Sequence, residues 1–257
     1  MKSTCRLFAL LVLAWLCVGC KAQNAEYHTR HDVRLHQFFP AVADSSSMVY
    51  HKGFALSYNE ATEQALWVGY MLTRDRVNGQ HPRRGKFRSD AAVATGSADY
   101  FDYKNSGFSR GHLAPAGDMK WDPVAMDESF LFSNMSPQEE SFNNGLWNHI
   151  ENKVRAWANR FDTLFVFTGP VFTPDDTLAI GNNRVGVPSA YYKVVFCPAM
   201  GKAIALIVPH RQAKAPWHSF ATSVDAVEAA TGIDFLHGIT NEEAIERDLC
   251  IECWNLH

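Results

Sequence analysis

The sequence predicts an α+β fold built around a mainly antiparallel sheet. Apolar runs with strand-like patterns recur along the chain, and turn residues separate neighbouring runs, as in strands joined by hairpins. A few segments with helix caps lie between these runs. The 257 residues are 47% hydrophobic and 20% charged, without a charge block, repeat or low-complexity tract. This composition is typical of soluble globular proteins and favours a single domain over residues 23–257.

The first half of the chain is expected to contain four strands. Residues 23–47 are polar and are expected to be extended or loosely packed. Alternating or continuous apolar runs then predict strands over residues 50–58, 65–73, 108–113 and 129–135. Between the second and third of these strands, residues 74–107 are rich in Arg, Gly, Asp and Ser, which indicates a long surface excursion.

A long helix is expected to follow the fourth strand. Ser136 is suited to cap this helix, Pro137 fits its first turn, and Glu139 places an acid near the positive end of the helix dipole. The helix is expected to run to about Arg160.

Three more strands and two short helices complete the prediction. The strands are expected over residues 163–168, 191–196 and 203–208, and the helices over residues 223–230 and 241–249. Gly169 and Pro170 are expected to stop the first of these strands, and Asn241 is expected to cap the last helix.

Residues 1–22 have the pattern of an export signal. Two basic residues precede an apolar run at 7–18, which is too short to cross a bilayer. Two processing sites compete: Cys20 as the lipidated first residue of a lipoprotein, or ordinary cleavage after Ala22. The mature protein is therefore expected in a periplasm, on an outer membrane as a lipoprotein, or outside the cell.

The local distribution of charge says more about possible partners than the net charge does. Without residues 1–22 the chain has 21 Lys and Arg against 27 Asp and Glu, a net charge of −6, which counts mildly against a nucleic-acid partner. A basic cluster precedes the third strand, with one acid, Asp75, among its members. The cluster consists of Arg74, Arg76, Arg83, Arg84, Lys86 and Arg88. A solvated loop and a phosphate-facing role are both open for this cluster.

Three cysteines lie outside the export signal. Cys197, Cys250 and Cys253 would meet an oxidising compartment in an exported chain, so one disulfide is expected and one thiol is left over. The pairing stays open at this stage. A redox pair or half of a zinc site at the Cys250–Cys253 CxxC is a less favoured alternative, since zinc needs four ligands.

The strand over residues 108–113 carries the first candidate for catalysis. His112 is a residue that, as neutral imidazole, takes a proton from water near pH 7. Arg110 lies two positions earlier, on the same face of a strand, and its guanidinium is suited to hold a phosphate. A core histidine bonded to a backbone carbonyl is the alternative, but a buried arginine beside it requires an anion or a carboxylate.

The long helix carries the second group of candidates. Asn143 begins an Asn-Asn-Gly sequence of poor helix formers, which predicts either a simple kink or a functional exception. Steps of four residues from Asn143 reach Trp147, Glu151 and Arg155, which are expected to share one face of the helix. An amide oxygen is a ligand for Mg²⁺. Beside His112, this face would form a platform for a metal ion and a phosphate.

These motifs resemble the DNA/RNA non-specific endonuclease family. Further matching segments extend the resemblance over nearly all of the chain after the export signal. They are Ser133-Asn134-Met135-Ser136-Pro137-Gln138, Thr168-Gly169-Pro170-Val171, Val187-Pro188, Tyr192-Lys193-Val194, Thr222-Ser223-Val224-Asp225 and Thr231-Gly232-Ile233-Asp234-Phe235. The resemblance implies a ββα-metal (His-Me finger) nuclease fold with a mainly antiparallel central sheet flanked by helices.

The resemblance also implies roles for individual residues. His112 would be the general base, Asn143 the protein ligand of one Mg²⁺ (or Mn²⁺ or another divalent cation), and Glu151 would hold metal-bound waters. Arg110 and Arg155 would contact phosphate. A further arginine, Arg83 or Arg84, is expected to join them. No small-molecule cofactor is implied. In one departure from the family pattern, Ser109 stands where an aspartate is usual, which puts the tuning of Arg110 or His112 in question.

The function implied is an exported, Mg²⁺-dependent endonuclease that cuts both DNA and RNA and leaves 5′ phosphates. Two alternatives remain open on the sequence: a surface lipoprotein that captures nucleic acid without cutting it, and a phosphodiesterase of small nucleotides. The sequence makes no prediction of oligomeric state.

Overall fold

A seven-stranded antiparallel sheet forms the centre of the fold in the computed structural model, which describes residues 37–41 and 45–255. In their spatial order its strands are β1 (Met48–Tyr50), β2 (Ala55–Asn59), β3 (Gln64–Thr73), β6 (Thr163–Val171), β9 (Ala190–Cys197), β10 (Lys202–Pro209) and β11 (Ala221–Thr222). All six neighbouring pairs are antiparallel. The predicted α+β class with a mainly antiparallel sheet is thereby confirmed.

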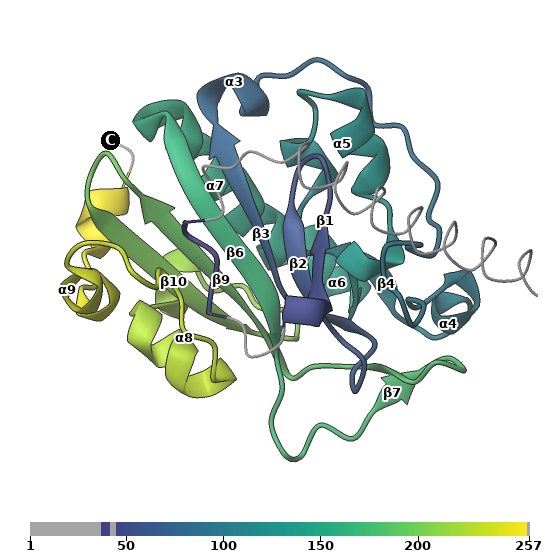
Figure 1. Ribbon diagram of the computed structural model, residues 1–257. Helices are drawn as coiled ribbons and strands as arrows, with labels where there is room; N and C mark the ends of the chain where they lie inside the picture. The colour runs from purple at the N-terminus through teal and green to yellow at the C-terminus, as the bar shows by residue number, and fades with distance from the viewer. Residues whose placement is uncertain (1–36, 42–44, 256–257) are drawn as a thin grey trace, which may run out of the picture.

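Helices cover both faces of this sheet (Figure 1). The α-helices are α3 (Arg74–Val77), α4 (Tyr100–Tyr103), α5 (Pro123–Glu128), α6 (Glu140–Phe142), α7 (Asn148–Phe161), α8 (Val224–Thr231) and α9 (Glu242–Arg247). A π-helical turn, η4 (Asn143–Trp147), joins α6 to α7. The 3₁₀ turns are η1 (Ser45–Ser47), η2 (Ala116–Asp118), η3 (Phe132–Asn134), η5 (Trp217–Phe220) and η6 (Ile251–Trp254). Two small two-stranded sheets pair β4 (Ser109–His112) with β5 (Met135–Gln138) and β7 (Ala179–Ile180) with β8 (Val185–Gly186).

The alternation of side chains along the central strands creates two apolar cores. On β6, Val166 points into the core that contains Trp157 of α7, whereas Phe165 and Phe167 point into the core that contains Val227 of α8. Since both faces are covered, β6 and β9 are buried along nearly their whole length. This explains why their sequences are continuous apolar runs rather than alternating ones. The helix α7, and the residues that it carries, therefore lie on one face of the sheet, and α8 lies on the other.

The strand predicted over residues 129–135 is wrong. These residues form the end of a turn and the 3₁₀ turn η3, and the strand β5 starts only at Met135. The side chain of Asn134 explains the difference. Its amide nitrogen donates to the carbonyl oxygens of Ala114 and Ser129 at 2.9 Å each, and its oxygen accepts from the Ala114 backbone N–H at 2.8 Å. These bonds satisfy the buried backbone without a ladder.

The predicted helix start at Ser136 is also wrong. Ser136 and Pro137 lie in β5, where Pro137 pairs with Arg110, and the helix begins at Glu140. The Ser136 hydroxyl does not cap a helix. It donates to Gln64 Oε1 at 2.6 Å and lies 2.7 Å from the Tyr191 hydroxyl, so it links β5 to the central sheet. The predicted helix end is confirmed within one residue, at Phe161.

Four other predictions need adjustment. The strand expected over residues 50–58 is two strands, β1 and β2, which are joined by a turn closed by the His51 N–H and the Phe54 carbonyl at 2.8 Å. The strand expected to stop at Gly169 continues to Val171. Gly169 lets the neighbouring strand β3 approach closely, because a Cβ on this residue would lie 2.2 Å from the Leu66 carbonyl oxygen. The excursion over residues 74–107 contains the short helices α3 and α4. Helix α9 has the predicted position without the predicted Asn241 side-chain cap.

The remaining predicted elements are confirmed with shifts of a residue or two. The strands β3, β4, β9 and β10 and the helix α8 have this outcome. The Ser223 hydroxyl caps α8 by accepting from the Ala226 N–H at 3.2 Å.

The expected export signal at residues 1–22, with Cys20, lies outside the described residues. None of the helices that the structure describes is both long and apolar enough to span a membrane.

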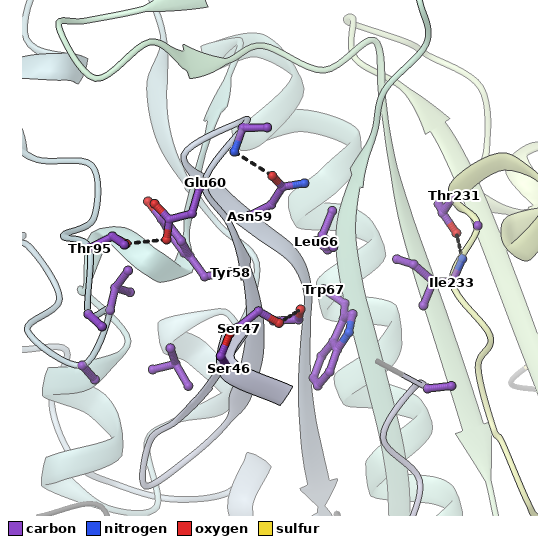
Figure 2. Close-up of a pocket in the computed structure, with 18 residues that line it drawn as sticks. Ser46, Ser47, Tyr58, Asn59, Glu60, Leu66, Trp67, Thr95, Thr231 and Ile233 are labelled. Carbon is purple, nitrogen blue, oxygen red and sulfur yellow. Dashed lines mark hydrogen bonds between the residues drawn. The ribbon is translucent and has the colours of Figure 1, made fainter. Parts of the chain in front are cut away.

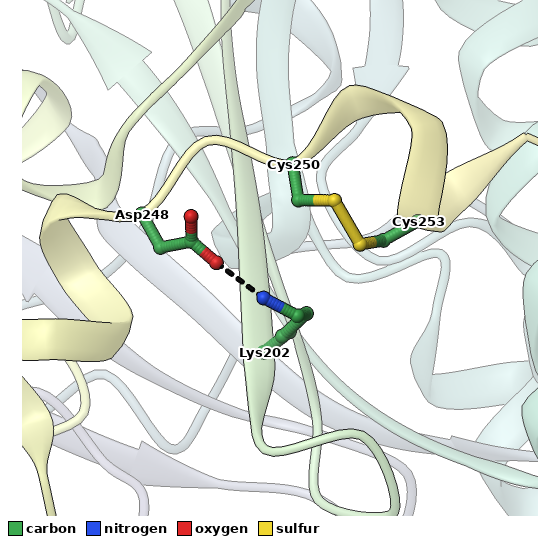
Figure 3. The surroundings of a disulfide bond; sticks show 4 residues. All are labelled: Lys202, Asp248, Cys250 and Cys253. Carbon is green, nitrogen blue, oxygen red and sulfur yellow. Dashed lines mark hydrogen bonds and ion pairs between the residues drawn. A yellow bond between two sulfur atoms is a disulfide. The ribbon is translucent and has the colours of Figure 1, made fainter.

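Among the described residues, one disulfide forms, between Cys250 and Cys253 (Figure 3). Cys197 is left as a buried thiol. This confirms the expected single disulfide with one free thiol and settles the pairing. Next to it, Lys202 of β10 donates to the Asp248 carboxylate at 2.5 Å. The segment after α9 is thereby fixed against the sheet.

Candidate active site

The two-stranded sheet of β4 and β5 presents Arg110 and His112 on one face. In this sheet His112 pairs with Met135 and Gly111 pairs with Ser136. The glycine between the two functional residues is required by packing on the opposite face, because a Cβ at Gly111 would lie 2.2 Å from the side chain of Gln138. Gln138 itself is fully buried. The Arg-Gly-His sequence therefore combines a functional face with a tightly packed reverse side.

Replacing Gly111 with alanine is expected to displace the strand that carries His112. Overpacking of a filled core costs about 1–3 kcal/mol, and we expect a loss of nuclease activity of about tenfold or more from the misplaced imidazole. The measurement is the cleavage rate together with the thermal unfolding midpoint. The double variant Gly111→Ala/Gln138→Ala removes the obstructing side chain and is expected to recover much of the lost activity; no recovery would contradict this account.

The Asn-Asn-Gly sequence breaks the helix, as the kink prediction requires. Residues Asn143–Trp147 form a π-helical turn, and Gly145 has non-helical dihedral angles (φ −97°, ψ −111°). Such insertions into helices are frequent at functional sites. The turn changes the predicted alignment: Asn143, Glu151 and Arg155 face one cleft, but Trp147 lies beneath it in the core, stacked on Phe142.

Six of the seven predicted site residues line one cleft of about 270 Å³. They come from four separate segments and are Arg83, Arg110, His112, Asn143, Glu151 and Arg155. The seventh, Arg84, is exposed and does not line the cleft. Of the two basic residues left as alternatives by the sequence, the structure thus places Arg83 at the site. Asn144 and Asn148 add further amides to the cleft wall.

His112 is held in an apolar and cationic environment. Its ring contacts Phe130 and Phe87, with ring centres 5.3 and 5.9 Å apart. Its Nε2 is buried and has no hydrogen-bonding partner among the described residues. Burial, followed by the charges of Arg83 and Arg110, lowers the pKa of His112 to about 3. The imidazole is therefore neutral at physiological pH, which is the state that accepts a proton.

Arg110 and Arg83 keep their charges available. The guanidinium of Arg110 lies 4.3 Å from the ring centre of Phe87 and 5.9 Å from that of Tyr100, and that of Arg83 lies 5.5 Å from Phe130. Neither arginine forms an ion pair with a carboxylate within residues 37–41 and 45–255. Two cations without an acidic partner at one cleft favour an anionic ligand.

Arg155 is held differently, by an acid that the sequence analysis did not assign. Its guanidinium donates to Asp118 Oδ1 at 2.6 Å and lies 3.8 Å from Glu151 Oε2. Asp118 is 1% exposed and also accepts from the Tyr70 hydroxyl at 2.8 Å. The only signal for Asp118 was its place six residues after His112. Its buried carboxylate fixes the direction in which Arg155 enters the cleft.

Lys193 is a second buried charge near the site that the sequence analysis did not assign. It is 1% exposed, its ammonium donates to Thr168 Oγ1 at 2.6 Å, and it lies 4.8 Å from the ring centre of Trp147. Burial raises the pKa of Glu151, and the charge of Lys193 is the largest influence that opposes this shift. A lysine in the middle of an apolar strand was the available signal.

A larger cavity, of about 600 Å³, lies between β2, β3 and residues 92–95 (Figure 2). No Lys, Arg or His is among the described residues that line it. Its polar groups are already used locally: Glu60 accepts from Thr95, and Asn59 accepts from the Ala61 N–H. This cavity therefore lacks the cations that a phosphate requires, and the smaller cleft is the better candidate site.

In this cleft a paired strand supplies a histidine, and the helical segment that follows it along the chain supplies an amide and a carboxylate. This arrangement is typical of the class of ββα-metal nucleases. Comparisons agree with this class. Residues 37–242 match the model of the family described as DNA/RNA non-specific endonuclease. The chain belongs to this family, and it is a nuclease that hydrolyses phosphodiester bonds.

The similarity extends to individual relatives and to the fold. Human mitochondrial endonuclease G is 34% identical over 204 residues, which cover 73% of this chain and 69% of that protein. Nuclease C1 of Cunninghamella echinulata var. echinulata is 34% identical over 202 residues, covering 72% and 80%. A chain in the solved structure of the EndoG/EndoGI complex superposes with a TM-score of 0.73 at 30% identity, covering 80% of this chain and 91% of that one.

The cleft suits the divalent metal ion that members of this family typically use. Asn143 offers an amide oxygen and Glu151 a carboxylate, and both are hard oxygen donors. Few protein ligands are expected for Mg²⁺, which keeps several waters of its shell. The partly open, polar cleft has room for such waters. The donor set therefore fits the metal.

Proposed function

We propose that this endonuclease is Mg²⁺-dependent, cuts DNA and RNA alike, and leaves 5′ phosphates. The observation that supports this most strongly is the meeting in one cleft of a neutral histidine, two oxygen donors, and two arginines that have no acidic partner in the described part of the chain. Each of these groups serves a separate requirement of phosphodiester hydrolysis: a proton acceptor, phosphate ligands and a metal platform.

His112 is the general base in this proposal. Its neutral imidazole accepts a proton from a water that is in line with the phosphorus. The new bond forms between that water oxygen and phosphorus, and the bond from phosphorus to the 3′ oxygen breaks. The upstream fragment is therefore left with a 3′ hydroxyl, and the phosphate stays on the 5′ oxygen of the downstream nucleotide. The apolar contacts of the ring with Phe87 and Phe130 set its position, since no carboxylate among the described residues orients it.

Asn143 and Glu151 would hold the metal in this proposal, Asn143 through its amide oxygen and Glu151 through water. When bound, the metal would stabilise negative charge on the phosphoryl oxygens and on the departing 3′ oxygen. Asn143 is neutral, so it does not reduce the positive charge at the site. Lys193, buried below, favours the ionised carboxylate of Glu151, the form that accepts hydrogen bonds from water.

The arginines bind the phosphate. Arg110 and Arg83 have no acidic partner in the described part of the chain and approach from the β4 side, whereas Arg155 is directed by Asp118 from α7. Contacts of this kind position the backbone of a nucleic acid and carry no base information. This supports weak sequence preference and cleavage of either sugar type.

Magnesium-dependent cleavage of both polymers is the first expected result. Purified residues 23–257 should nick supercoiled plasmid and degrade RNA in Mg²⁺, and should do neither in EDTA. Products labelled by a 5′-phosphate-dependent ligase would establish the end chemistry. A dinucleotide in parallel tests the smaller-substrate alternative, which would be favoured if it were hydrolysed as fast as the polymers. Tight binding of nucleic acid without cutting in any divalent ion would contradict the proposal.

We further propose that the protein acts after export, through the signal pattern at residues 1–22, with Cys20 as a site of lipid attachment or Ala22 as the last residue removed. The basis is the sequence pattern alone. Labelling of the expressed full-length chain with radioactive palmitate, with a Cys20→Ala control, distinguishes the two routes.

A further inference from the structure

Three carboxylates meet between α8 and α9, on the face of the sheet opposite to α7 and the cleft. Asp225 and Glu228 lie three positions apart on α8, and Glu246 reaches them from α9. One oxygen from each side chain lies within 4.8 Å of the others. Figure 1 shows both helices in front of the sheet, with α7 behind it. This cluster is therefore separate from the proposed catalytic machinery.

Glu246 is a buried carboxylate with an unpartnered oxygen in the described part of the chain. Its side chain is 5% exposed, and its Oε1 has no hydrogen-bonding partner within the described residues. A buried carboxylate normally requires a cation or a hydrogen-bond donor. Burial, together with the negative charges of Glu228, Glu242, Asp225 and Asp234, raises the pKa of Glu246 to about 8. The neighbouring carboxylates thus repel an ionised Glu246, which needs a cation beside it.

The neighbouring basic residues do not neutralise the cluster. Arg247 approaches only Asp225, with its Nε 3.8 Å from Oδ2, while its NH2 group donates to Glu243 at 2.7 Å. Its side chain is mostly exposed. Glu228 accepts one bond, from the Phe235 backbone N–H at 2.7 Å. Within the described ranges, Glu228 and Glu246 have no ion pair with a Lys or Arg side chain.

We propose that Asp225, Glu228 and Glu246 bind a calcium ion. Calcium takes six to eight oxygen ligands at roughly 2.3–2.6 Å with flexible geometry, so oxygens up to about 5 Å apart can share one ion. The observed separation of at most 4.8 Å meets this condition. Asp225 and Glu228 are half-buried, which leaves room for water to complete the shell. Magnesium is less suitable, because it demands a near-ideal octahedron.

The ion would fix the C-terminal segment to the sheet. Helix α9 is held at its far end by the Lys202–Asp248 pair and continues into the Cys250–Cys253 turn (Figure 3). Trp254 at the end of this segment packs against Trp157 of α7. A bound calcium would anchor α9 to α8, and thus the start of a segment that reaches from one face of the sheet to the other.

Thermal unfolding of the full chain in calcium and in EGTA tests the proposal. With calcium at about 100 times its Kd, we expect the midpoint to rise by roughly 5–10 °C. The variant Glu246→Gln is expected to lose this rise and, in EGTA, to unfold at or above the wild-type midpoint, because it removes repulsion. This second readout distinguishes a lost ion from a misfolded variant. Glu243→Gln, on the exposed side of α9, is the matched control and should keep the rise.

Calcium binding at the proposed catalytic cleft must be separated from binding at α8 and α9. The variant Asn143→Ala is expected to retain the calcium-dependent rise, and equilibrium dialysis with radioactive calcium should find one ion per chain in it. Adding Glu246→Gln to that variant should abolish binding. The inference is overturned if the wild type shows no rise, or if Glu246→Gln keeps it, in which case Glu246 carries a proton instead. Neither result depends on nuclease activity.

Discussion

Replacing His112 with alanine is expected to reduce kcat by about 10³-fold or more, since positioned general bases contribute 10²–10⁴-fold and the arginines and metal platform remain. KM for nucleic acid should change little, because the proposed mechanism assigns phosphate binding to Arg83, Arg110 and Arg155. The measurement is the initial rate on plasmid and on RNA over a range of substrate concentrations.

His218→Ala is a suitable control for the His112 variant. His218 is exposed on η5, away from the cleft, so its removal should leave the rate within about twofold of wild type. Circular dichroism and the unfolding midpoint should show that His112→Ala is folded. A rate within a few-fold of wild type in folded His112→Ala would remove His112 from the mechanism.

Replacing Trp157 with alanine is expected to cause the largest loss of stability, about 3–5 kcal/mol. Trp157 is fully buried on α7, and its ring centre lies 5.2 Å from that of Trp217 and 4.9 Å from that of Trp254. Its indole N–H donates to the Trp254 carbonyl oxygen at 2.6 Å. The substitution therefore leaves a cavity and an unpaired carbonyl at the point where the C-terminal segment joins the core.

Urea or thermal unfolding measures the effect of Trp157→Ala, with an expected fall of the midpoint by roughly 10 °C. Phe101→Ala is the comparison, because Phe101 is 69% exposed and its loss should change the free energy of unfolding by about 0.5 kcal/mol or less. A change for Trp157→Ala as small as that of Phe101→Ala would show that the tail does not contribute to the core.

The sequence predicted secondary structure best where the spacing of apolar residues and the flanking turn or cap residues indicate the same element. The strands β3, β9 and β10 and the capped helix α8 are of this kind, because local preference and burial favour the same structure. Prediction failed over residues 129–139, where polar side chains within an apolar run decide the backbone. Asn134 bonds to backbone groups of a distant loop and Ser136 bonds to Gln64 and Tyr191, and neither partner can be identified from local sequence.

The residues that line the candidate cleft were predicted more completely than the fold around it, and their roles stay predictions. Arg110, His112, Asn143 and Glu151 lie in short motifs, so their possible functions can be inferred from residues that are close in sequence. Asp118 and Lys193 are different, because their importance comes from burial beside Arg155 and Glu151, which lie on another element. A role that depends on a neighbour in three dimensions, rather than on a motif, cannot be predicted from the local sequence.

The disulfide has a consequence for where this fold can persist. Cys250 and Cys253 are three positions apart, so the bond closes a very small loop and removes little freedom from the unfolded chain. The other cysteine of the described chain, Cys197, is a reduced thiol inside the apolar core. Within the described chain, no disulfide therefore links distant parts of the sheet or the cleft, which are held by packing, hydrogen bonds and ion pairs. We expect reduction of the disulfide to lower the stability of the fold only slightly, so that the fold persists in reducing as well as oxidising surroundings.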